Sequence, residues 1–387
     1  MTTVDRPKSL DEYVEQLGIA PDEAARARSD NTLGLLILDR LIFPEPGVYT
    51  ADEVTARSGL AADAGKFWRA LGYPSPEPED RIFSQIDLEM LQLIDAILRL
   101  DLLQKEVALQ LTRVIGSSMA RVAQAQVDAM EPRLDAPPVA DPTELAVQRA
   151  GMLLPLTPRI MEYAWRRHFQ IAARRRMVRD SLAAAGEEAP VCVGFVDLVG
   201  FTALSQQLGD MELAAVVDRF ETIAYDVVTG HGGRVVKMIG DEVMFEVADP
   251  LAGLETALSL SDAYHTDEAI ADVRAGLAHG PVLAREGDLF GPTVNLASRI
   301  VSIAYPGSVV VSEEVRTAVG DEAPFVWKPL RTRYLKDIGR VHLFNVRRAD
   351  DEFEREGVLA RARRQRGTMR DRVADLVERL AGEGEEE

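Results

Sequence analysis

The stretch "VCVGFVDLVGFT", residues 191–202, decides the fold of the second half of the chain. Its first residues form a continuous apolar run, which predicts a buried strand, and the glycine-containing end predicts a turn. Asp197 interrupts the apolar run, and an unpaired carboxylate in a core costs free energy. The position of Asp197 therefore indicates a site where another charge meets this side chain.

The segments after this strand alternate between helix and strand patterns. An amphipathic helix is predicted at 210–231, and "GRVVKMIGDEVMFEV" (233–247) predicts a hairpin that turns at Gly240 and Asp241. Further helices and strands are predicted at 250–265, 273–280, 293–304 and 308–312. The resulting β-α-β-β-α-β order is the ferredoxin-like arrangement, so the expected class is α+β.

Two carboxylates fall at neighbouring ends of these predicted strands. Asp197 ends the first strand and Asp241 lies in the hairpin turn, which a β-α-β-β unit places beside that strand end. Paired carboxylates near a backbone carbonyl are hard oxygen ligands suited to Mg²⁺ or Mn²⁺, with a substrate phosphate completing the shell. The amides of the turn at 198–202 could bind phosphate oxygens. The alternative is that Asp197 caps a helix and Asp241 only forms a turn.

Three segments together resemble the signature segments of the class III nucleotide cyclase catalytic domain. They are "FVDLVGFT" (195–202), "VKMIGDEVMF" (236–245) and "DLFGPTVNLASR" (288–299), and the resemblance covers roughly 190–347. Six functional positions of that family occur here in order: Asp197, Lys237, Asp241, Asp288, Asn295 and Arg299. A joint match of this kind is far more specific than a lone glycine motif.

The resemblance implies an adenylate cyclase that converts ATP into cyclic AMP and pyrophosphate with two Mg²⁺ or Mn²⁺ ions. It implies that Asp197, Leu198 (through its carbonyl) and Asp241 hold the metals, that Asn295 positions the ribose and that Arg299 stabilises charge on the α-phosphate. The remaining implied substrate contacts are Lys237, Asp288, Leu198, Val199, Gly200, Phe201, Thr202 and, in a looser match, Lys336. In the family the active sites lie between two subunits, so the resemblance also implies a homodimer with two sites.

The predicted base-recognition residues favour adenine. Adenine offers N1 as an acceptor and its N6 amino group as a donor, whereas lysine only donates and aspartate only accepts. Lys237 and Asp288 therefore complement adenine, and guanine would leave both side chains mismatched.

The first half of the chain reads as a helical regulatory domain over 1–157, joined by a linker helix at 158–190 to a catalytic domain at 191–348, with a helical and acidic tail at 349–387. This order resembles the autoinhibited soluble cyclases of actinobacteria, which implies regulation through the first domain by pH, a small molecule or a lipid. The segment 49–94 also resembles a MerR-type helix-turn-helix. A DNA-binding regulator with a nucleotide-sensing domain is the alternative, but residues 51–100 carry nine acidic and five basic side chains, unlike a DNA reader.

Composition restricts the remaining function classes. The net charge is −19, which disfavours nucleic acids and anionic membranes as partners of the whole chain. Cys192 is the only cysteine and lies in an apolar run, so we expect a packed thiol and no disulfide. No signal-peptide pattern and no apolar run of membrane-spanning length is present, which predicts a cytoplasmic protein.

Overall fold

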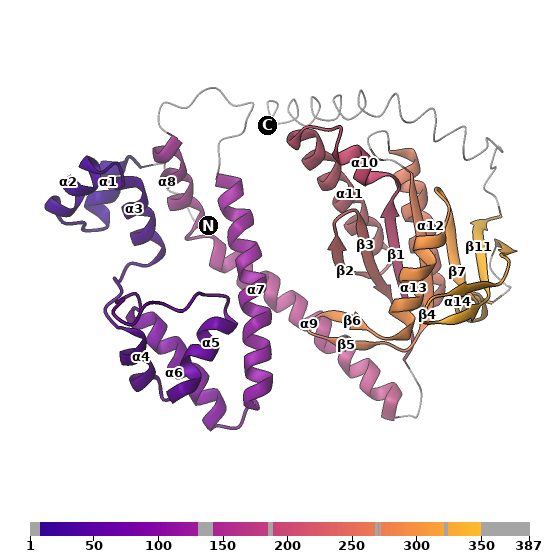
Figure 1. Cartoon of the computed structure of the whole chain (residues 1–387), viewed down its shortest axis with the longest axis horizontal. Helices are drawn as coiled ribbons and strands as arrows, with labels where there is room; N and C mark the ends of the chain where they lie inside the picture. The colour runs from indigo at the N-terminus through magenta and orange to yellow at the C-terminus, as the bar shows by residue number, and fades with distance from the viewer. Residues whose placement is uncertain are drawn as a thin grey trace. The chain divides into compact units, whose positions relative to one another are not determined.

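The computed structural model describes residues 8–130, 142–184, 189–267, 270, 272–320 and 324–349. The tail predicted at 349–387, apart from its first residue, and most of the proline-rich segment at 130–144 lie outside these residues. The chain divides into two compact units, Met1–Arg175 and Arg176–Glu387 (Figure 1). The division falls inside one helix, α9, so the domain boundaries drawn from the sequence stay a prediction.

The first unit is helical. Its helices are α1 (Leu10–Gln16), α2 (Pro21–Ser29), α3 (Leu33–Ile42), α4 (Ala51–Ser58), the short 3₁₀ helix η1 (Ala61–Asp63), α5 (Ala64–Ala70), α6 (Gln85–Arg99), α7 (Lys105–Met130), α8 (Pro142–Leu153) and the start of α9 (Thr157–Ala184). Ser9, Thr50 and Ser84 begin α1, α4 and α6 with capping boxes, in which the hydroxyl and an acidic side chain three residues later satisfy free amides. None of the described helices is long and apolar enough to cross a membrane.

Two apolar clusters stabilise this unit. One gathers α1, α2, α3 and α8 around Tyr13 and Ile37, and the other gathers α4 to α7 around Phe67 and Leu91. Helices α4, α5 and α6 occupy the segment that resembles a helix-turn-helix, and an isolated bridge joins Tyr49 to Phe83 beside them. The resemblance itself stays a prediction.

The second unit is built on a seven-stranded sheet in the order β2-β3-β1-β4-β7-β11-β8. Its strands are β1 (Val191–Leu198), β2 (Arg234–Ile239), β3 (Glu242–Val247), β4 (Val273–Gly280), β7 (Val309–Ser312), β8 (Phe325–Pro329) and β11 (Leu343–Arg348). The first four strands pair antiparallel as β2-β3-β1-β4, which is the ferredoxin-like order, so the predicted fold class is confirmed.

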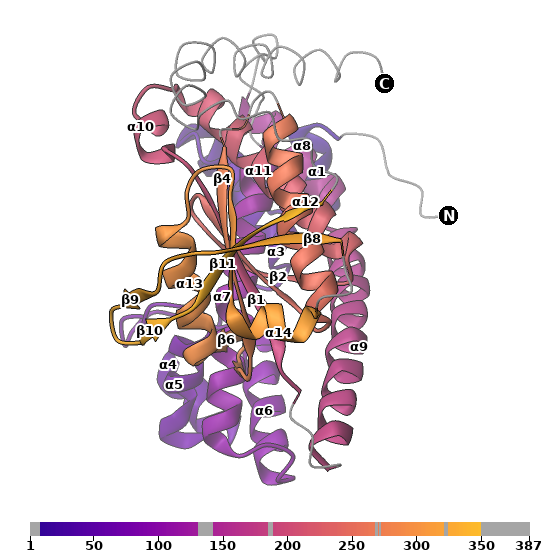
Figure 2. The same ribbon diagram turned by 90° about the vertical axis from the view of Figure 1, so that its right-hand side faces the viewer.

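Helices cover both faces of this sheet. Helices α11 (Asp210–Gly230) and α12 (Pro250–Thr266) pack on one face, and α13 (Pro292–Ile303) packs on the other (Figure 2). Alternate residues of β1 serve the two cores, because Cys192 and Val196 pack under α11 and α12 whereas Val193 and Phe195 pack under α13. This alternation places Asp197 on the face that carries α13.

Shorter elements complete the unit. They are α10 (Phe201–Ser205), α14 (Glu313–Val319), the hairpin of β5 (Leu283–Arg285) and β6 (Asp288–Phe290), and the hairpin of β9 (Arg333–Leu335) and β10 (Gly339–Val341). Strand β7 runs parallel to β4, and α13 makes the crossover between them.

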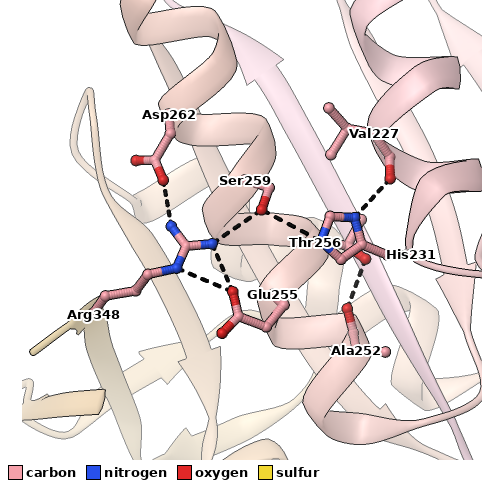
Figure 3. Close-up of polar contacts among 8 residues, drawn as sticks. All are labelled: Val227, His231, Ala252, Glu255, Thr256, Ser259, Asp262 and Arg348. Carbon is pink, nitrogen blue, oxygen red and sulfur yellow. Dashed lines mark hydrogen bonds and ion pairs between the residues drawn. The ribbon is translucent and has the colours of Figure 1, made fainter. Parts of the chain in front are cut away.

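Arg348 ties the last described strand to α12. Its guanidinium donates to Glu255 Oε2 at 2.6 Å and to Ser259 Oγ at 3.0 Å, and it pairs with Asp262 (Figure 3). Ser259 also faces Nε2 of His231, whose Nδ1 bonds the Val227 carbonyl (Figure 3). This polar cluster lies on the face opposite Asp197 and holds the end of β11 against α12.

Candidate active site

Asp197 stands in a row of three charged side chains that crosses the sheet. The register of β1 aligns it with Glu242 on β3 and with Arg274 on β4. Arg274 binds its carboxylate from Nε at 2.6 Å and from Nη2 at 2.5 Å, both to Oδ2. The Asp197 side chain is only 15% exposed, so Arg274 offsets part of the cost of burying this carboxylate.

Asp241 lies where the sequence predicted it, in the turn between β2 and β3. Gly240 before it has φ +64°, a conformation that favours glycine in so tight a turn. The backbone carbonyl of Asp241 accepts a hydrogen bond from the Leu198 amide at 3.0 Å. This bond holds the turn against the end of β1, so the two aspartates proposed as metal ligands lie at the same end of the sheet.

The charges at this end of the sheet favour a bound cation. Burial raises the pKa of Asp197, Arg274 opposes this shift, and the nearby Asp241 carboxylate adds to it. Burial, together with Asp197 and Asp241, raises the pKa of Glu242 to about 7. Carboxylates with raised pKa values hold their negative charge at a cost, and a cation would relieve that cost.

The predicted metal ligands fit a magnesium or manganese ion only if ligands from outside the chain complete its coordination shell. Within the described residues, no three His, Cys, Asp or Glu side chains are grouped so that they could hold a metal ion alone. Two carboxylates and a backbone carbonyl leave ligand positions open, and phosphate oxygens and water usually fill such positions on Mg²⁺. The residues therefore fit a metal that binds together with a phosphorylated substrate.

The turn after β1 offers fewer free amides than the sequence suggested. The amides of Leu198 and Val199 already donate to the carbonyls of Asp241 and Asp272, at 3.0 Å and 2.9 Å. The expectation that these two amides are free to meet phosphate is therefore wrong for this conformation. Across the described residues, no backbone acceptor is recorded for the amides of Gly200, Phe201 and Thr202, and these three remain candidates for phosphate.

Lys237 and Asp288 meet directly, although they lie on different hairpins. Lys237 Nζ donates to Asp288 Oδ2 at 2.5 Å, and Asp288 Oδ1 accepts the Leu289 amide at 2.7 Å. Burial raises the pKa of Asp288, but the bonds from Lys237 and Leu289 outweigh burial and leave that pKa below its usual value. The predicted base-recognition residues are therefore adjacent within one chain, and Asp288 is ionised.

Asn295 and Arg299 lie on α13, whereas the two aspartates lie at strand ends. Both project from the exposed side of α13, whose opposite side buries Ala297 and Ile300 against the sheet. In the part of the chain that the structure describes, no hydrogen bond or ion pair joins either side chain to Asp197 or Asp241. Lys336 is exposed in the turn between β9 and β10, and it too has no recorded contact with the other predicted site residues. One chain does not bring all the predicted residues together.

Sequence reasoning missed Arg274 and Glu242. Each is a charged residue at the first or second position of a strand that continues with apolar residues. The sequence shows these charged positions, but only the strand register shows that both side chains lie beside Asp197.

Comparison with known proteins agrees with this geometry. The family profile of the adenylate and guanylate cyclase catalytic domain matches residues 184–344. An adenylate cyclase of Streptomyces coelicolor is 34% identical over 299 residues, which cover 76% of each chain. The chain belongs to the class III adenylate cyclase family.

Other relatives extend this match beyond the cyclase domain. An adenylate cyclase of Glutamicibacter nicotianae is 32% identical, covering 76% of this chain and 77% of its own. A pH-sensitive adenylate cyclase of Mycobacterium tuberculosis is 32% identical, covering 89% of this chain and 88% of its own. Among solved structures, the catalytic core of a rhodopsin-guanylyl cyclase with converted specificity, in complex with ATPαS, is 26% identical with a TM-score of 0.39, covering 41% of this chain and 96% of its own.

Proposed function

We propose that this protein is an adenylate cyclase that converts ATP into 3′,5′-cyclic AMP and pyrophosphate. The observation that carries the proposal is the meeting of Asp197 and Asp241 at the end of β1, through the bond from the Leu198 amide to the Asp241 carbonyl. The printed activity of the relatives that match three quarters of the chain supports the same reaction.

The metal ligands in this proposal are Asp197, the Leu198 carbonyl and Asp241, which would hold two Mg²⁺ or Mn²⁺ ions. Bound there, the ions supply positive charge that activates the ribose 3′-hydroxyl and stabilises the departing pyrophosphate. The 3′-oxygen gives its proton to water and bonds to the α-phosphorus, while the bond from that phosphorus to the α,β-bridging oxygen breaks and this oxygen leaves with the pyrophosphate. Because Asp197 Oδ2 is held by Arg274, the other oxygen, Oδ1, remains for a cation.

The remaining residues bind and orient the nucleotide. Lys237 donates to adenine N1 and Asp288 accepts from the N6 amino group. The amides of Gly200, Phe201 and Thr202, together with Lys336, donate to the triphosphate oxygens. Asn295 orients the ribose, and the Arg299 guanidinium stabilises the charge that develops on the α-phosphate.

A homodimer completes the site in this proposal. Asn295 and Arg299 lie on the exposed side of α13, so a second copy can present them to the aspartates of the first. A two-fold dimer repeats this exchange, which gives two equivalent sites.

The test is cyclic AMP production from ATP with Mn²⁺ by the purified full-length protein and by two variants. Asp197→Ala should lose at least about 100-fold in kcat, because a metal ligand is removed. Asp226→Ala, which changes an exposed aspartate of α11, should leave kcat and KM unchanged. The proposal fails if the wild-type protein makes no cyclic AMP or if Asp197→Ala keeps full activity.

We also propose that the helical first unit regulates this activity, in response to pH, a small molecule or a lipid. The support is that the match to the relative named as pH-sensitive spans both units rather than the cyclase domain alone. Removing residues 1–185 should change the specific activity several-fold and alter its pH profile. An identical rate and profile for the shortened protein would contradict regulation by the first unit.

A further inference from the structure

Arg234 joins two strands and a hairpin turn next to the predicted base-recognition pair. Its Nε donates to Glu246 Oε1 at 3.0 Å, and its Nη1 donates to the Gly287 carbonyl at 2.8 Å. Arg234 belongs to β2, Glu246 to β3, and Gly287 to the turn between β5 and β6. The planar guanidinium thus bridges the edge of the main sheet and a separate hairpin, which a point-like ammonium group could not do with the same geometry.

The turn that Arg234 contacts directly precedes Asp288. Arg285 and Asp288 are paired across the β5–β6 hairpin, so Glu286 and Gly287 are the two residues of its turn. Both have positive φ, +57° and +82°, as in a type I′ turn. Since Asp288 follows Gly287 directly, a bond to the Gly287 carbonyl limits where the Asp288 carboxylate can lie.

An irregularity in β2 aligns Arg234 with Lys237. Residues three apart on a regular strand point to opposite faces. The register of β2 against β3 shifts between Val235 and Lys237, so Arg234 lies opposite Glu246 while Lys237 lies opposite Met244. Glu246 and Met244 are two residues apart and share a face, and the shift therefore brings Arg234 and Lys237 to the same face, toward the β5–β6 hairpin.

Burial strengthens the bridge at its Glu246 end. The Glu246 side chain is 11% exposed and that of Arg234 is 31% exposed, whereas Lys237 is 41% exposed. An ion pair shielded from water is screened less by salt than the exposed contact between Lys237 and Asp288. The less exposed pair is thus suited to fixing the more exposed one.

We propose that Arg234 and Glu246 are positioning residues for nucleobase recognition: they hold the β5–β6 turn so that Asp288 lies beside Lys237 and reads the base. This inference rests on the proposed adenylate cyclase function and adds two residues to its specificity. Neither residue touches the reacting atoms, so both act through Asp288 and affect binding of the base rather than the chemical step.

The experiment is steady-state kinetics of the full-length protein with ATP and with GTP. Arg234→Ala should raise KM for ATP about tenfold, the scale of one lost polar contact to the base, and change kcat by no more than about twofold. The preference for ATP over GTP should fall by a similar factor. Arg219→Ala is the matched control, because it breaks an arginine–carboxylate bond to Asp267 at 2.7 Å on the opposite face of the sheet, and it should leave KM and base preference unchanged.

A double-mutant comparison separates positioning from general loss of structure. If Arg234 acts through Asp288, then adding Arg234→Ala to Asp288→Ala should raise KM no further. Should Arg234→Ala fail to fold, Glu246→Gln keeps the side-chain shape and removes the charge, and the same shift in KM and base preference is expected to a smaller degree.

Three results would overturn the inference: an unchanged KM and base preference in an active Arg234→Ala variant, a fall in kcat with KM unchanged, or additive effects of the two alanine substitutions. These outcomes differ from failure of the proposed function, in which the wild-type protein itself would make no cyclic AMP.

Discussion

At the scale of single residues, burial and neighbouring charges at the end of β1 shift the pKa values of carboxylate side chains. Asp197 is paired with Arg274, whereas Glu242 lies near the carboxylates of Asp197 and Asp241, whose effect on its pKa Arg274 opposes only in part. Burial, together with these two carboxylates, raises the pKa of Glu242 to about 7 in the metal-free protein. That shift ties the stability of the metal-free protein to pH.

Glu242→Gln should stabilise the metal-free protein above pH 7 and have little effect at pH 4.5. The ordinary pKa of glutamate is 4.5, so between that value and 7 the folded protein keeps a proton that the unfolded chain releases, and wild-type stability falls as pH rises. Glutamine resembles the protonated form. We expect a gain of about 1 kcal/mol at pH 8, because solvent screens this half-buried side chain.

Urea unfolding in EDTA at both pH values measures this difference. Glu313→Gln, which changes an exposed glutamate of α14, is the control and should show no such pH dependence. A stability gain of equal size at pH 4.5 and pH 8 would show that the proton is not the cause.

Cys192 should resist thiol reagents in the folded protein. Its side chain is fully buried, and burial raises its pKa to about 12, so the reactive thiolate is almost absent near neutral pH. We expect a chromogenic disulfide reagent to detect no thiol at pH 8 in native protein and one thiol per chain in denaturant. Rapid labelling of the native protein would show that β1 opens readily.

At the scale of elements, the contact between α13 and β4 depends on Gly276. A Cβ at this position would lie 2.4 Å from the Val301 backbone nitrogen and 2.8 Å from the Ala297 carbonyl oxygen. Main-chain atoms of a helix cannot move aside singly, so Gly276→Ala should cost about 1–3 kcal/mol of unfolding free energy. Because α13 carries Asn295 and Arg299, the proposed activity should fall as well.

Denaturant unfolding with a glycine control tests this packing. Gly230→Ala, at the end of α11, adds a Cβ that meets nothing within 4 Å and should be neutral or stabilising by up to about 1 kcal/mol. Equal stability of Gly276→Ala and the wild-type protein would rule out so close an approach of α13 to β4.

The sequence predicted the core elements well, for reasons visible in particular residues. The apolar run before Asp197 and the glycine turn at 240 mark β1 and the β2–β3 hairpin, because burial and turn geometry restrict residue types there. It did not predict β8, β11 and the short strands β5, β6, β9 and β10. Three-residue strands carry no periodicity, and partners distant in the chain decide whether they form.

The same limit applies to the site. Asp197 and Asp241 could be joined from strand order alone, whereas Lys237 and Asp288 were joined only through family resemblance. Their contact depends on the register shift in β2 and on the bridge from Arg234, and neither follows from a pattern of residue types.

At the scale of the whole molecule, the proposed site needs two copies of the chain. Asp197→Ala and Arg299→Ala should each be nearly inactive alone, because each spoils both sites of its own homodimer. In a mixture that exchanges subunits, half of the dimers pair one variant with the other and keep one intact site, so about a quarter of the wild-type activity should return.

Assays of the separate and the mixed proteins for cyclic AMP measure this recovery. A mixture of Asp197→Ala with Asp241→Ala is the control and should stay inactive, since both substitutions fall on the same half of the site. No recovery in the first mixture, despite subunit exchange, would mean that one chain supplies both halves.

The bond between Lys237 and Asp288 also affects which ions can bind at the proposed base-recognition site. Because Lys237 Nζ pairs with Asp288 Oδ2 at 2.5 Å, the proposed base-recognition site offers neither a lone ammonium group to free phosphate nor a lone carboxylate to free metal ions. Both side chains are partly exposed, so parting them costs at most about 1 kcal/mol, which a well-matched base can repay. In the proposed site, the pair would therefore separate for a nucleobase with complementary hydrogen bonds but not for a simple inorganic ion.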